Sequence, residues 1–333
     1  MKLTITTPSR LHITLIDMNA SIGRVDGSIG ITLDEPVVKI STRKSDIVEI
    51  IGNLKPQLSQ YIKTDFKISE NFEHMSNSAK ALLPDEEGIL ISIEKDYPSH
   101  IGLGSGTQAS LAAGMATNKL YDLGLSIYEV AVKVGRGGTS GIGVAAFENG
   151  GFILDGGHKF LEKKAFLPSS ATDLPPAPVL VRKDFPDWDI VVAVPEQKGA
   201  SNTNEVNIFH KACPVPLHEV EKLSHVILMQ LLPAFSEEDI IAFGKSINAI
   251  QEFGFKKLEV ELQPVSKKLM QVLRDSGAHG AGMSSFGPTV YAIGEDAENL
   301  KNTAEDFLGG KGQVFITKAR NTGARIEKSF SLT

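Results

Sequence analysis

Short apolar or alternating runs follow one another through the opening part of the chain. They occupy 2–7, 10–16, 29–33, 37–42 and 47–50, and turn residues separate them. Alternation with a period of two is typical of strands that bury one face. The pattern therefore predicts that the chain begins with a β-sheet.

Helical and strand-like patterns alternate over the next part of the chain. Residues 57–83 are polar with scattered apolar positions, which predicts a helix, and 88–95 alternates isoleucine with polar residues, like a half-buried strand. An alanine-rich run at 106–122 predicts a second helix. Ser126 and Glu129 have the spacing of a capping box, so we expect another helix to begin there.

Prolines cluster at 166–178 and mark the boundary that we predict between two domains, 1–170 and 171–333. After this boundary we expect a polar loop at 195–207 and a helix that Ser236 caps. The apolar pattern predicts further strands and helices at 189–194, 216–232, 237–253, 265–276, 288–293, 312–317 and 325–329. This order indicates an α+β fold in two layers and not a series of repeating βαβ units.

Composition excludes several classes of function. Of 333 residues, 41% are apolar and 22% are charged, and the net charge of −6 provides no basic field for nucleic acid or anionic lipid. The single cysteine, Cys213, excludes an intramolecular disulfide. No apolar run reaches the roughly 20 residues that span a bilayer, and the first residues lack the apolar core of a signal peptide. We therefore expect a cytoplasmic protein whose partners are small molecules, not nucleic acid or a membrane.

The positions of the glycines carry more information about function than the rest of the composition. The 31 glycines are not spread evenly. They gather at 23–30, 102–106, 135–143, 150–157 and 277–287. Clusters of this kind permit tight turns or a close approach of the backbone to a ligand.

The segment 98–108 lies between a predicted strand and the alanine-rich helix. Its glycines, at 102, 104 and 106, let backbone N–H groups converge, and the helix N-terminus adds partial positive charge, so the segment suits a phosphate. It lacks the Gly-Lys-Ser/Thr ending of a Walker A loop and the following parallel strand of a dinucleotide-binding unit. A glycine-rich turn without a ligand is the alternative.

Two other segments accompany this loop, 8–12 near the N-terminus and 277–288 near the C-terminus. In this order the three segments resemble the motifs of the GHMP kinase family, and the resemblance covers nearly the whole chain. It implies an N-terminal domain similar to ribosomal protein S5 domain 2, a ferredoxin-like C-terminal domain, and an active site between them. Because 277–288 is rich in small residues, we expect it to pack against other backbone and support the phosphate loop.

One position departs from the kinases of this family. Several of them carry an aspartate that serves the hydroxyl being phosphorylated, whereas Gly143 stands at that position in the matching stretch 137–143. Loss of this carboxylate weakens kinase chemistry without excluding it, since homoserine kinase also lacks the acid. A kinase that uses Mg-ATP and a non-catalytic ligand sensor are therefore the alternatives to the function considered next.

The segments 10–18, 23–30, 135–143 and 147–158 resemble a member of the family that is not a kinase. This resemblance implies that 5-phosphoribosyl diphosphate is joined to 4-aminobenzoate or 4-hydroxybenzoate at the carboxyl-bearing carbon, with release of CO2 and diphosphate, in methanopterin biosynthesis. A diphosphate substrate suggests Mg2+ as the cofactor. The resemblance also implies a homodimer.

Acidic and basic residues near the glycine clusters are the candidates for this chemistry. The candidate catalytic residues are Asp26, Asp17 and His12, and Asp155 is the candidate Mg2+ ligand. The candidate phosphate- and substrate-binding residues are Ser9, Arg10, Arg24, Gly102, Gly104, Ser105, Gly106, Thr107, Gln108, Arg136, Thr139 and Ser140. We expect 23–30 to be too rich in glycine for an ordinary strand, with Arg24 and Asp26 on one face. The alternatives are a turn-stabilising role for each aspartate and a purely structural role for His12.

Overall fold

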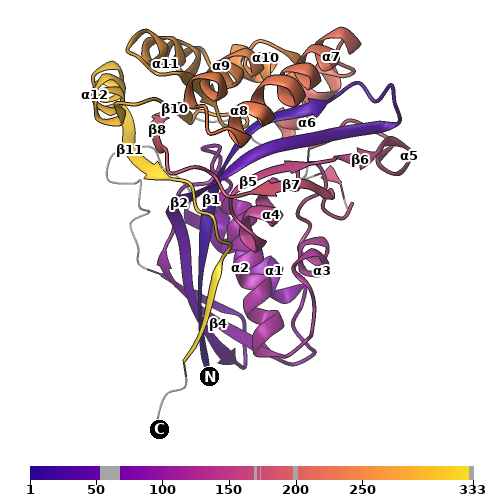
Figure 1. The fold of residues 1–333 in the computed structure, drawn as a ribbon. Helices are drawn as coiled ribbons and strands as arrows, with labels where there is room; N and C mark the ends of the chain where they lie inside the picture. The colour runs from indigo at the N-terminus through magenta and orange to yellow at the C-terminus, as the bar shows by residue number, and fades with distance from the viewer. Residues whose placement is uncertain (53–67, 169–170, 173, 198–201, 330–333) are drawn as a thin grey trace.

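Two mainly antiparallel β-sheets and the helices that cover them make up the chain (Figure 1). The computed structural model describes residues 1–52, 68–168, 171–172, 174–197 and 202–329. The part of the predicted helix 57–83 that precedes position 68 lies outside these residues. Within the described part of the chain, no helix has the length and apolar character needed to cross a bilayer.

A long hairpin forms the centre of the first sheet. Its strands are β1, over Lys2–Asp17, and β2, over Arg24–Ser45. Each strand joins runs that the apolar pattern had separated, because a shift in pairing register between residues 7 and 9 accommodates Pro8 without ending β1. Strand β2 includes most of 23–30, but Asp26 and Gly27 have φ of 68° and 66°, so this part is not an ordinary strand, as expected. The glycine at position 30 permits close packing, because a Cβ there would lie 2.2 Å from Cγ2 of Ile142.

The first sheet has the order β12-β1-β2-β4-β3, with β5 and β6 also paired to β2, and β7 paired to β5. These strands are β3 (Glu49–Ile51), β4 (Gly88–Lys95), β5 (Phe152–Asp155), β6 (His158–Lys159), β7 (Val179–Lys183) and β12 (Arg325–Ser329). The strand predicted at 88–95 is confirmed. Both β7 and β12 follow the boundary predicted at 170, yet they pair within this sheet, so that boundary does not divide the two sheets cleanly.

The helices beside the first sheet are α1 (Ile68–Lys80), α2 (Ser105–Leu120), α3 (Ile127–Lys133), α4 (Ile142–Glu148) and α5 (Phe160–Lys163). Helix α2, the predicted alanine-rich helix, is buried along most of its length because small side chains let its neighbours approach. The capping box at α3 is confirmed. Oγ of Ser126 accepts from the backbone N–H of Glu129 at 3.3 Å, and the Glu129 carboxylate accepts from the N–H of Ser126 at 2.8 Å.

The second sheet has the order β11-β8-β10-β9, and all its pairs are antiparallel. Its strands are β8 (Asp189–Pro195), β9 (Gly280–Met283), β10 (Val290–Ile293) and β11 (Gly312–Lys318). The helices after β8 are α6 (Asn202–Ala212), α7 (Leu217–Val226), a π-helical turn (Ile227–Leu231), α8 (Leu232–Ser236), α9 (Ile240–Ile250), α10 (Gly254–Glu261) and α11 (Pro264–Asp275), and α12 (Ala297–Leu308) precedes β11. This strand order confirms the expected ferredoxin-like domain.

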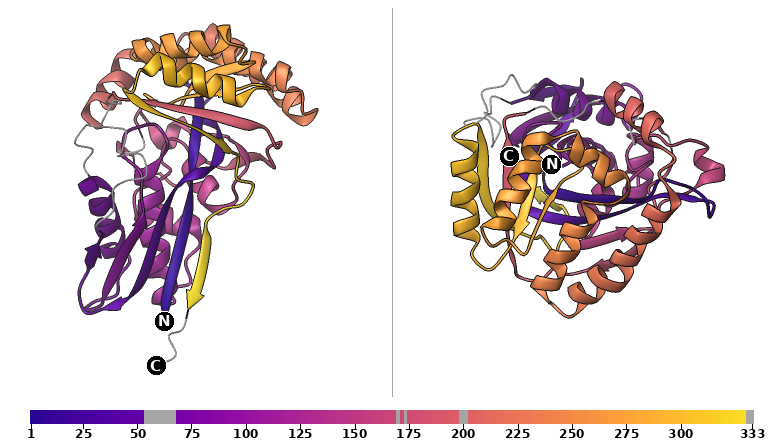
Figure 2. Two further views of the ribbon diagram at one scale, coloured as in Figure 1. Left: turned by 90° about the vertical axis from the view of Figure 1, so that its left-hand side faces the viewer. Right: turned by 90° about the horizontal axis from the view of Figure 1, so that it is seen from above.

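Figure 2 shows how the two halves are joined. The helices of the second half form a layer at one end of the molecule, and β12 returns from there to run beside β1. The last strand of the chain therefore fixes the N-terminal strand in the first sheet.

Two local predictions for the second half are wrong. Helix α6 begins at position 202, inside the expected loop 195–207. Asp239, not Ser236, caps α9, since its Oδ1 accepts from the N–H of Ala242 at 2.9 Å. Ser236 is the last residue of the preceding helix α8 and is therefore not free to begin a new one.

Candidate active site

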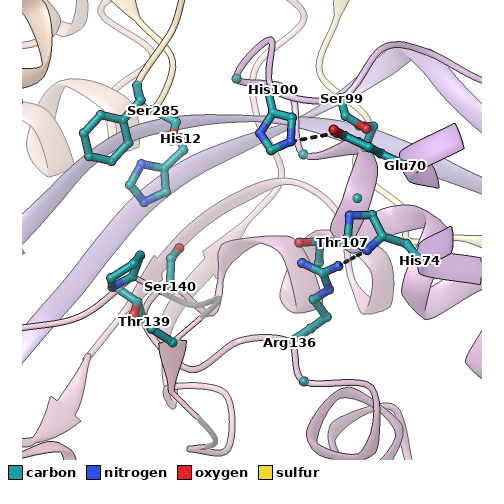
Figure 3. Close-up of a pocket in the computed structure, with 18 of the residues that line it drawn as sticks. His12, Glu70, His74, Ser99, His100, Thr107, Arg136, Thr139, Ser140 and Ser285 are labelled. Atoms are coloured by element: carbon teal, nitrogen blue, oxygen red, sulfur yellow. Dashed lines mark hydrogen bonds and ion pairs between the residues drawn. The ribbon is translucent and has the colours of Figure 1, made fainter. Parts of the chain in front are cut away.

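A cavity of about 930 Å³ is lined by residues from both halves of the chain. Its walls are the loop 99–107, helix α1, the segment 134–140, strand β1, helices α6 and α10, and residues 285–287. Side chains of the cavity lie in two groups (Figure 3), with Glu70, His74, Ser99, His100, Thr107 and Arg136 on one side and His12, Thr139, Ser140 and Ser285 on the other. We call the first group the loop end and the second group the His12 end.

The glycine loop is formed by close backbone contacts that exclude side chains. A Cβ on Gly102 would lie 2.5 Å from the carbonyl oxygen of Ser284, and Ser284 Oγ donates to the Gly102 carbonyl at 2.7 Å. The segment 277–288 therefore supports the loop by packing, as its small residues predict. Gly104 has a φ of +85° and precedes α2, whose N-terminus has no side-chain cap. The first N–H groups of α2 are therefore directed toward the cavity without a competing side chain.

Two arginines bring positive charge to the loop end. Arg10 lines the cavity, and its Nη1 donates to the carbonyl of Gly102 at 2.5 Å. Arg136 donates from Nη2 to Nδ1 of His74 at 2.9 Å and from Nε to Oγ of Ser110 at 3.1 Å. Burial lowers the pKa of Arg136 to about 10, so the guanidinium stays charged at neutral pH.

The His74 ring is neutral at physiological pH. Burial, followed by the charge of Arg136, lowers the pKa of His74 to about 4. The neutral ring can accept a hydrogen bond from Arg136, whereas an imidazolium could not. Its edge also packs on the loop, because a Cβ on Gly106 would lie 3.0 Å from two atoms of the ring. His74 therefore fixes the guanidinium of Arg136 beside the loop.

Helix α1 was not among the predicted site elements, although it supplies several cavity residues. Glu70, Glu73, His74 and Asn77 all line the cavity, and Nε2 of His100 lies 2.8 Å from a Glu70 oxygen. Their spacing of three, one and three residues places them on one face of a helix. This polar face was visible in the sequence, but nothing in the sequence indicated that it faced the glycine loop.

The His12 end combines an imidazole with apolar walls. Leu15, Phe209 and Phe286 line the cavity together with His12. Burial, then the charges of Arg10 and Lys256, lowers the pKa of His12 well below its ordinary value, so the ring is neutral. Nδ1 of His12 is buried and has no hydrogen-bond partner among the described residues. The residue lines the cavity, but this nitrogen itself is covered by protein.

The predicted carboxylates lie outside the described lining of the cavity. Asp17 forms a turn, with Oδ1 accepting from the N–H groups of Asn19 at 2.7 Å and Ala20 at 2.9 Å. Asp155 is buried and accepts from Ser28, from Gly141 N–H and from Gly157 N–H. Because protein donors already surround both oxygens of Asp155, the structure speaks against this residue as the Mg2+ ligand. The turn-stabilising alternative holds for Asp17.

Three predicted binding residues lie outside the described cavity wall, and two of them, Arg24 and Gln108, have structural partners. Arg24 donates to the carbonyls of Gly156 at 2.9 Å and Gly157 at 2.7 Å. Gln108 donates from Nε2 to the carbonyl of Gly143 at 2.9 Å, and Ser9 is fully buried. The other predicted residues, Arg10, Gly102, Gly104, Ser105, Gly106, Thr107, Arg136, Thr139 and Ser140, all line the cavity.

Asp26 lies in a buried charge cluster behind the cavity. Nζ of Lys163 donates to both its oxygens, at 2.8 and 2.7 Å, and to Oγ1 of Thr139 at 2.9 Å. Nδ1 of His158 lies 2.8 Å from Asp26. Asp26 and Arg24 therefore do not share a face toward a ligand. Asp26 does not line the described cavity, and its contacts reach the cavity wall through Lys163 and Thr139.

Comparisons with known proteins agree with this fold. The description "GHMP kinases N terminal domain" matches residues 67–151 and "GHMP kinases C terminal" matches residues 231–308. Mevalonate kinase from L. major has a TM-score of 0.67 at 16% identity, with 96% of each chain covered. Homoserine kinase from Cytophaga hutchinsonii has a TM-score of 0.65 at 17% identity, covering 98% of this chain and 97% of that chain. Fold and site together define a protein of the GHMP kinase class.

Closer relatives within this class are not named as kinases. The β-ribofuranosylphenol 5′-phosphate synthase of Archaeoglobus fulgidus is 46% identical over 96% of this chain and 98% of its own length. The protein of the same name from Methanothermobacter thermautotrophicus is 45% identical over 98% and 99% of the two chains. This chain belongs to their family and is an enzyme of the pentosyltransferase type.

The Asp26 cluster predicts a loss of stability on substitution. In Asp26→Asn the buried ammonium of Lys163 loses its counter-charge, so the free energy of unfolding should fall by about 3 kcal/mol. Asparagine tolerates the positive φ of position 26, which keeps backbone strain from confusing the result. Urea unfolding at neutral pH is the measurement, with Asp17→Asn as the matched control because asparagine retains the turn-forming oxygen. Equal stabilities of the two variants would contradict the buried pair.

The His74–Arg136 contact predicts a dependence on pH. The folded pKa of about 4 lies below the ordinary value of 6.5, so the unfolded chain takes up the proton first on acidification. The stability that His74 contributes is complete above pH 6.5 and is lost as the pH falls toward 4. His74→Gln keeps an acceptor for Arg136 without titrating. The difference in unfolding free energy between wild type and this variant should therefore shrink between about pH 7 and 4.5. If the unfolding free energies of wild type and His74→Gln changed in parallel with pH, the lowered pKa of His74 would be refuted.

Proposed function

We propose that this enzyme transfers the 5-phosphoribosyl group of 5-phosphoribosyl diphosphate to the carboxyl-bearing carbon of 4-hydroxybenzoate, releasing diphosphate and CO2. The observation that carries the proposal is a single cavity with an anion-binding loop end and an apolar, aromatic His12 end. The name of the relatives specifies a phenol product, which favours 4-hydroxybenzoate over 4-aminobenzoate as the acceptor. The homodimer, the cytoplasmic location and the absence of nucleic-acid and membrane partners stay predictions.

The loop end suits the phosphate groups of the donor. The N–H groups at the start of α2 and the guanidinium of Arg136 face one region of the cavity. Arg10 adds a second guanidinium below the loop, 3.1 Å from the position of a Cβ on Gly104. Fixed donors and charges of this kind stabilise the extra negative charge that develops on the departing diphosphate, which lowers the barrier to cleavage of the glycosidic bond.

Mg2+ fits the loop end as an ion shared with the diphosphate. The described residues include no group of three or more His, Cys, Asp or Glu that could hold a metal by themselves. Glu70 and Glu73 of α1 line the cavity, and Mg2+ in enzymes is commonly held by one or two carboxylates together with substrate phosphates. These two glutamates would hold the ion, which would neutralise charge on the diphosphate.

The His12 end suits a benzoate ring. Phe209 and Phe286, whose ring centroids are 6.2 Å apart, form an apolar wall that excludes water from an oxocarbenium-like ribose. The neutral His12 lines this end and can contact a polar substituent of the acceptor. The ring attacks through the carbon that bears the carboxylate, and loss of CO2 restores aromaticity. No base is then needed to remove a ring proton.

Kinase activity is the less favoured alternative. A Cβ on Gly143 would lie 2.9 Å from Cγ2 of Thr107, so this position has no room for the aspartate that several GHMP kinases carry. The carbonyl of Gly143 is also fixed by Gln108. A phosphorylated hydroxyl would lack a carboxylate partner at this point.

Trapping of labelled CO2 tests the proposed reaction. The enzyme is incubated with Mg2+, 5-phosphoribosyl diphosphate and 4-hydroxybenzoate that carries 14C in its carboxyl group. We expect one equivalent of CO2 and one of diphosphate per turnover, with 4-aminobenzoate as the slower acceptor. ATP in place of the donor should give neither CO2 nor ADP. ADP formation coupled to an alcohol acceptor, with no CO2 from either benzoate, would establish the kinase instead.

Gly104→Val should abolish this activity while the fold survives. A side chain at this φ is strained by about 1–3 kcal/mol, and a Cβ would press against Arg10, at 3.2 Å from Cζ, and narrow the phosphate site. Gly124→Val is the matched control, since Gly124 has a φ of +70° with no atom within 4 Å of a Cβ and lies outside the described cavity lining. Both variants should lose similar amounts in Tm, but only Gly104→Val should lose CO2 release. Full activity of Gly104→Val would remove the loop from the site.

A further inference from the structure

A chain of hydrogen bonds leads from the cavity wall to a buried carboxylate. Ser140 lines the cavity at the His12 end, close to Thr139 (Figure 3). Its Oγ lies 2.8 Å from Oγ of Ser28, a fully buried residue of β2. Ser28 Oγ in turn donates to Oδ2 of Asp155, which is also fully buried. No part of the mechanism described so far uses these three groups.

The donors around Asp155 determine the direction of this chain. Gly141 N–H donates to Oδ2 and Gly157 N–H donates to Oδ1, both at 3.0 Å, so both oxygens act as acceptors. With a pKa of about 6, the carboxyl group is ionised at neutral pH. Ser28 donates its single hydroxyl proton to Asp155. The hydrogen bond between the two serines must therefore be donated by Ser140. Ser140 also accepts from the N–H of Ile142 at 3.3 Å, which leaves one lone pair of its Oγ for the cavity.

We propose that Ser140, Ser28 and Asp155 form a proton relay that accepts the phenolic proton of the acceptor while its ring attacks the ribose. The inference rests on the proposed function and deepens it, because it assigns the base for the hydroxyl of a 4-hydroxybenzoate. Ser140 is the catalytic residue that touches the substrate. Ser28 and Asp155 act through it as positioning residues.

The transferred proton and electron pairs balance over the two chemical steps. In the first, the phenolic O–H bond breaks and its electron pair forms the ring C=O bond, while the carboxyl-bearing carbon bonds to the anomeric carbon and the C–O bond to diphosphate breaks. The proton passes to Ser140, Ser140 passes its own to Ser28, and Ser28 protonates Asp155. In the second, CO2 leaves, its bonding electron pair restores the aromatic ring, and the phenolic oxygen recovers a proton along the reversed chain.

The surroundings of Asp155 suit a reversible acceptor of this kind. Burial raises the pKa of the Asp155 carboxyl to about 6, although the hydrogen bonds from Ser28, Gly157 and Gly141 lower it. A carboxylate in this range takes a proton from a strongly acidified phenol and returns it at neutral pH. Removing the proton increases electron donation from oxygen into the ring, which favours attack through the carbon para to it. The relay thus supplies a base where Gly143 excludes an aspartate.

Breaking the chain at either serine tests the relay. Ser28→Ala and Ser140→Ala should each lower kcat for 4-hydroxybenzoate by about a hundredfold, the usual contribution of general base catalysis, with the KM for 5-phosphoribosyl diphosphate unchanged. The double variant should lose no more than either single variant, because both interrupt one chain. Ser246→Ala, which removes a buried serine hydroxyl bonded to the carbonyl of Ala242, is the control and should keep full activity.

A ring-fluorinated 4-hydroxybenzoate whose phenol is already ionised at the assay pH shows the cause of a lower kcat. It distinguishes the loss of a proton acceptor from a disturbance of packing in the variants. Both variants should turn over this acceptor at nearly the wild-type rate, since no proton has to be removed. Equal losses with both acceptors, additive losses in the double variant, or unchanged kcat with 4-hydroxybenzoate would each overturn the relay. If the wild type releases no CO2 from any benzoate, the proposed function itself fails, and the relay fails with it. Ser140→Ala, on the cavity wall, provides the test if Ser28→Ala does not fold.

Discussion

The close approach of the backbone at Gly102 to the backbone at Ser284 is the contact on which the cavity depends. It joins the glycine loop of the first half to the segment after β9 in the second half. No side chain fits at Gly102, so the loop is held by backbone contacts and directs the N–H groups of α2 toward the cavity. Because residues from both halves line the cavity, this junction sets the relative position of whatever groups bind at its two ends.

The charged side chains near this cavity have different kinds of partner. Arg136 is held by the neutral His74, so its positive charge is not cancelled by a nearby carboxylate. Two of the aspartates that sequence reasoning placed in the site, Asp26 and Asp155, are instead buried behind its wall, where Asp26 pairs with Lys163. These buried acids reach the hydroxyl groups of Thr139 and Ser140 through Lys163 and Ser28.

The same arrangement explains how one fold serves different reactions. A GHMP-type glycine loop cradles phosphate groups whether these belong to a nucleotide or to a sugar diphosphate, because backbone N–H groups and a helix N-terminus recognise charge alone. At the His12 end, Phe209 and Phe286 provide an apolar wall. Close to the loop end, an acid at position 143 would require Thr107 to shift, because a Cβ there would lie 2.9 Å from its Cγ2. The reaction type thus follows from the second substrate's side of the cavity.

The sequence by itself determined those strands, caps and loops that depend on residues close together in the chain. Alternation predicted β4, and the spacing of Ser126 and Glu129 predicted the capping box. The glycine loop was a candidate phosphate site because its glycines let backbone N–H groups converge before a helix. Only the tertiary structure decided which side chains share the cavity. The polar face of α1 contacts the glycine loop, and the relay joins Ser28 to Asp155, although these residues lie far apart in the chain. Asp26 pairs with the buried Lys163 and does not line the cavity. Contacts of this kind depend on how strands and helices pack, which the local sequence pattern does not encode.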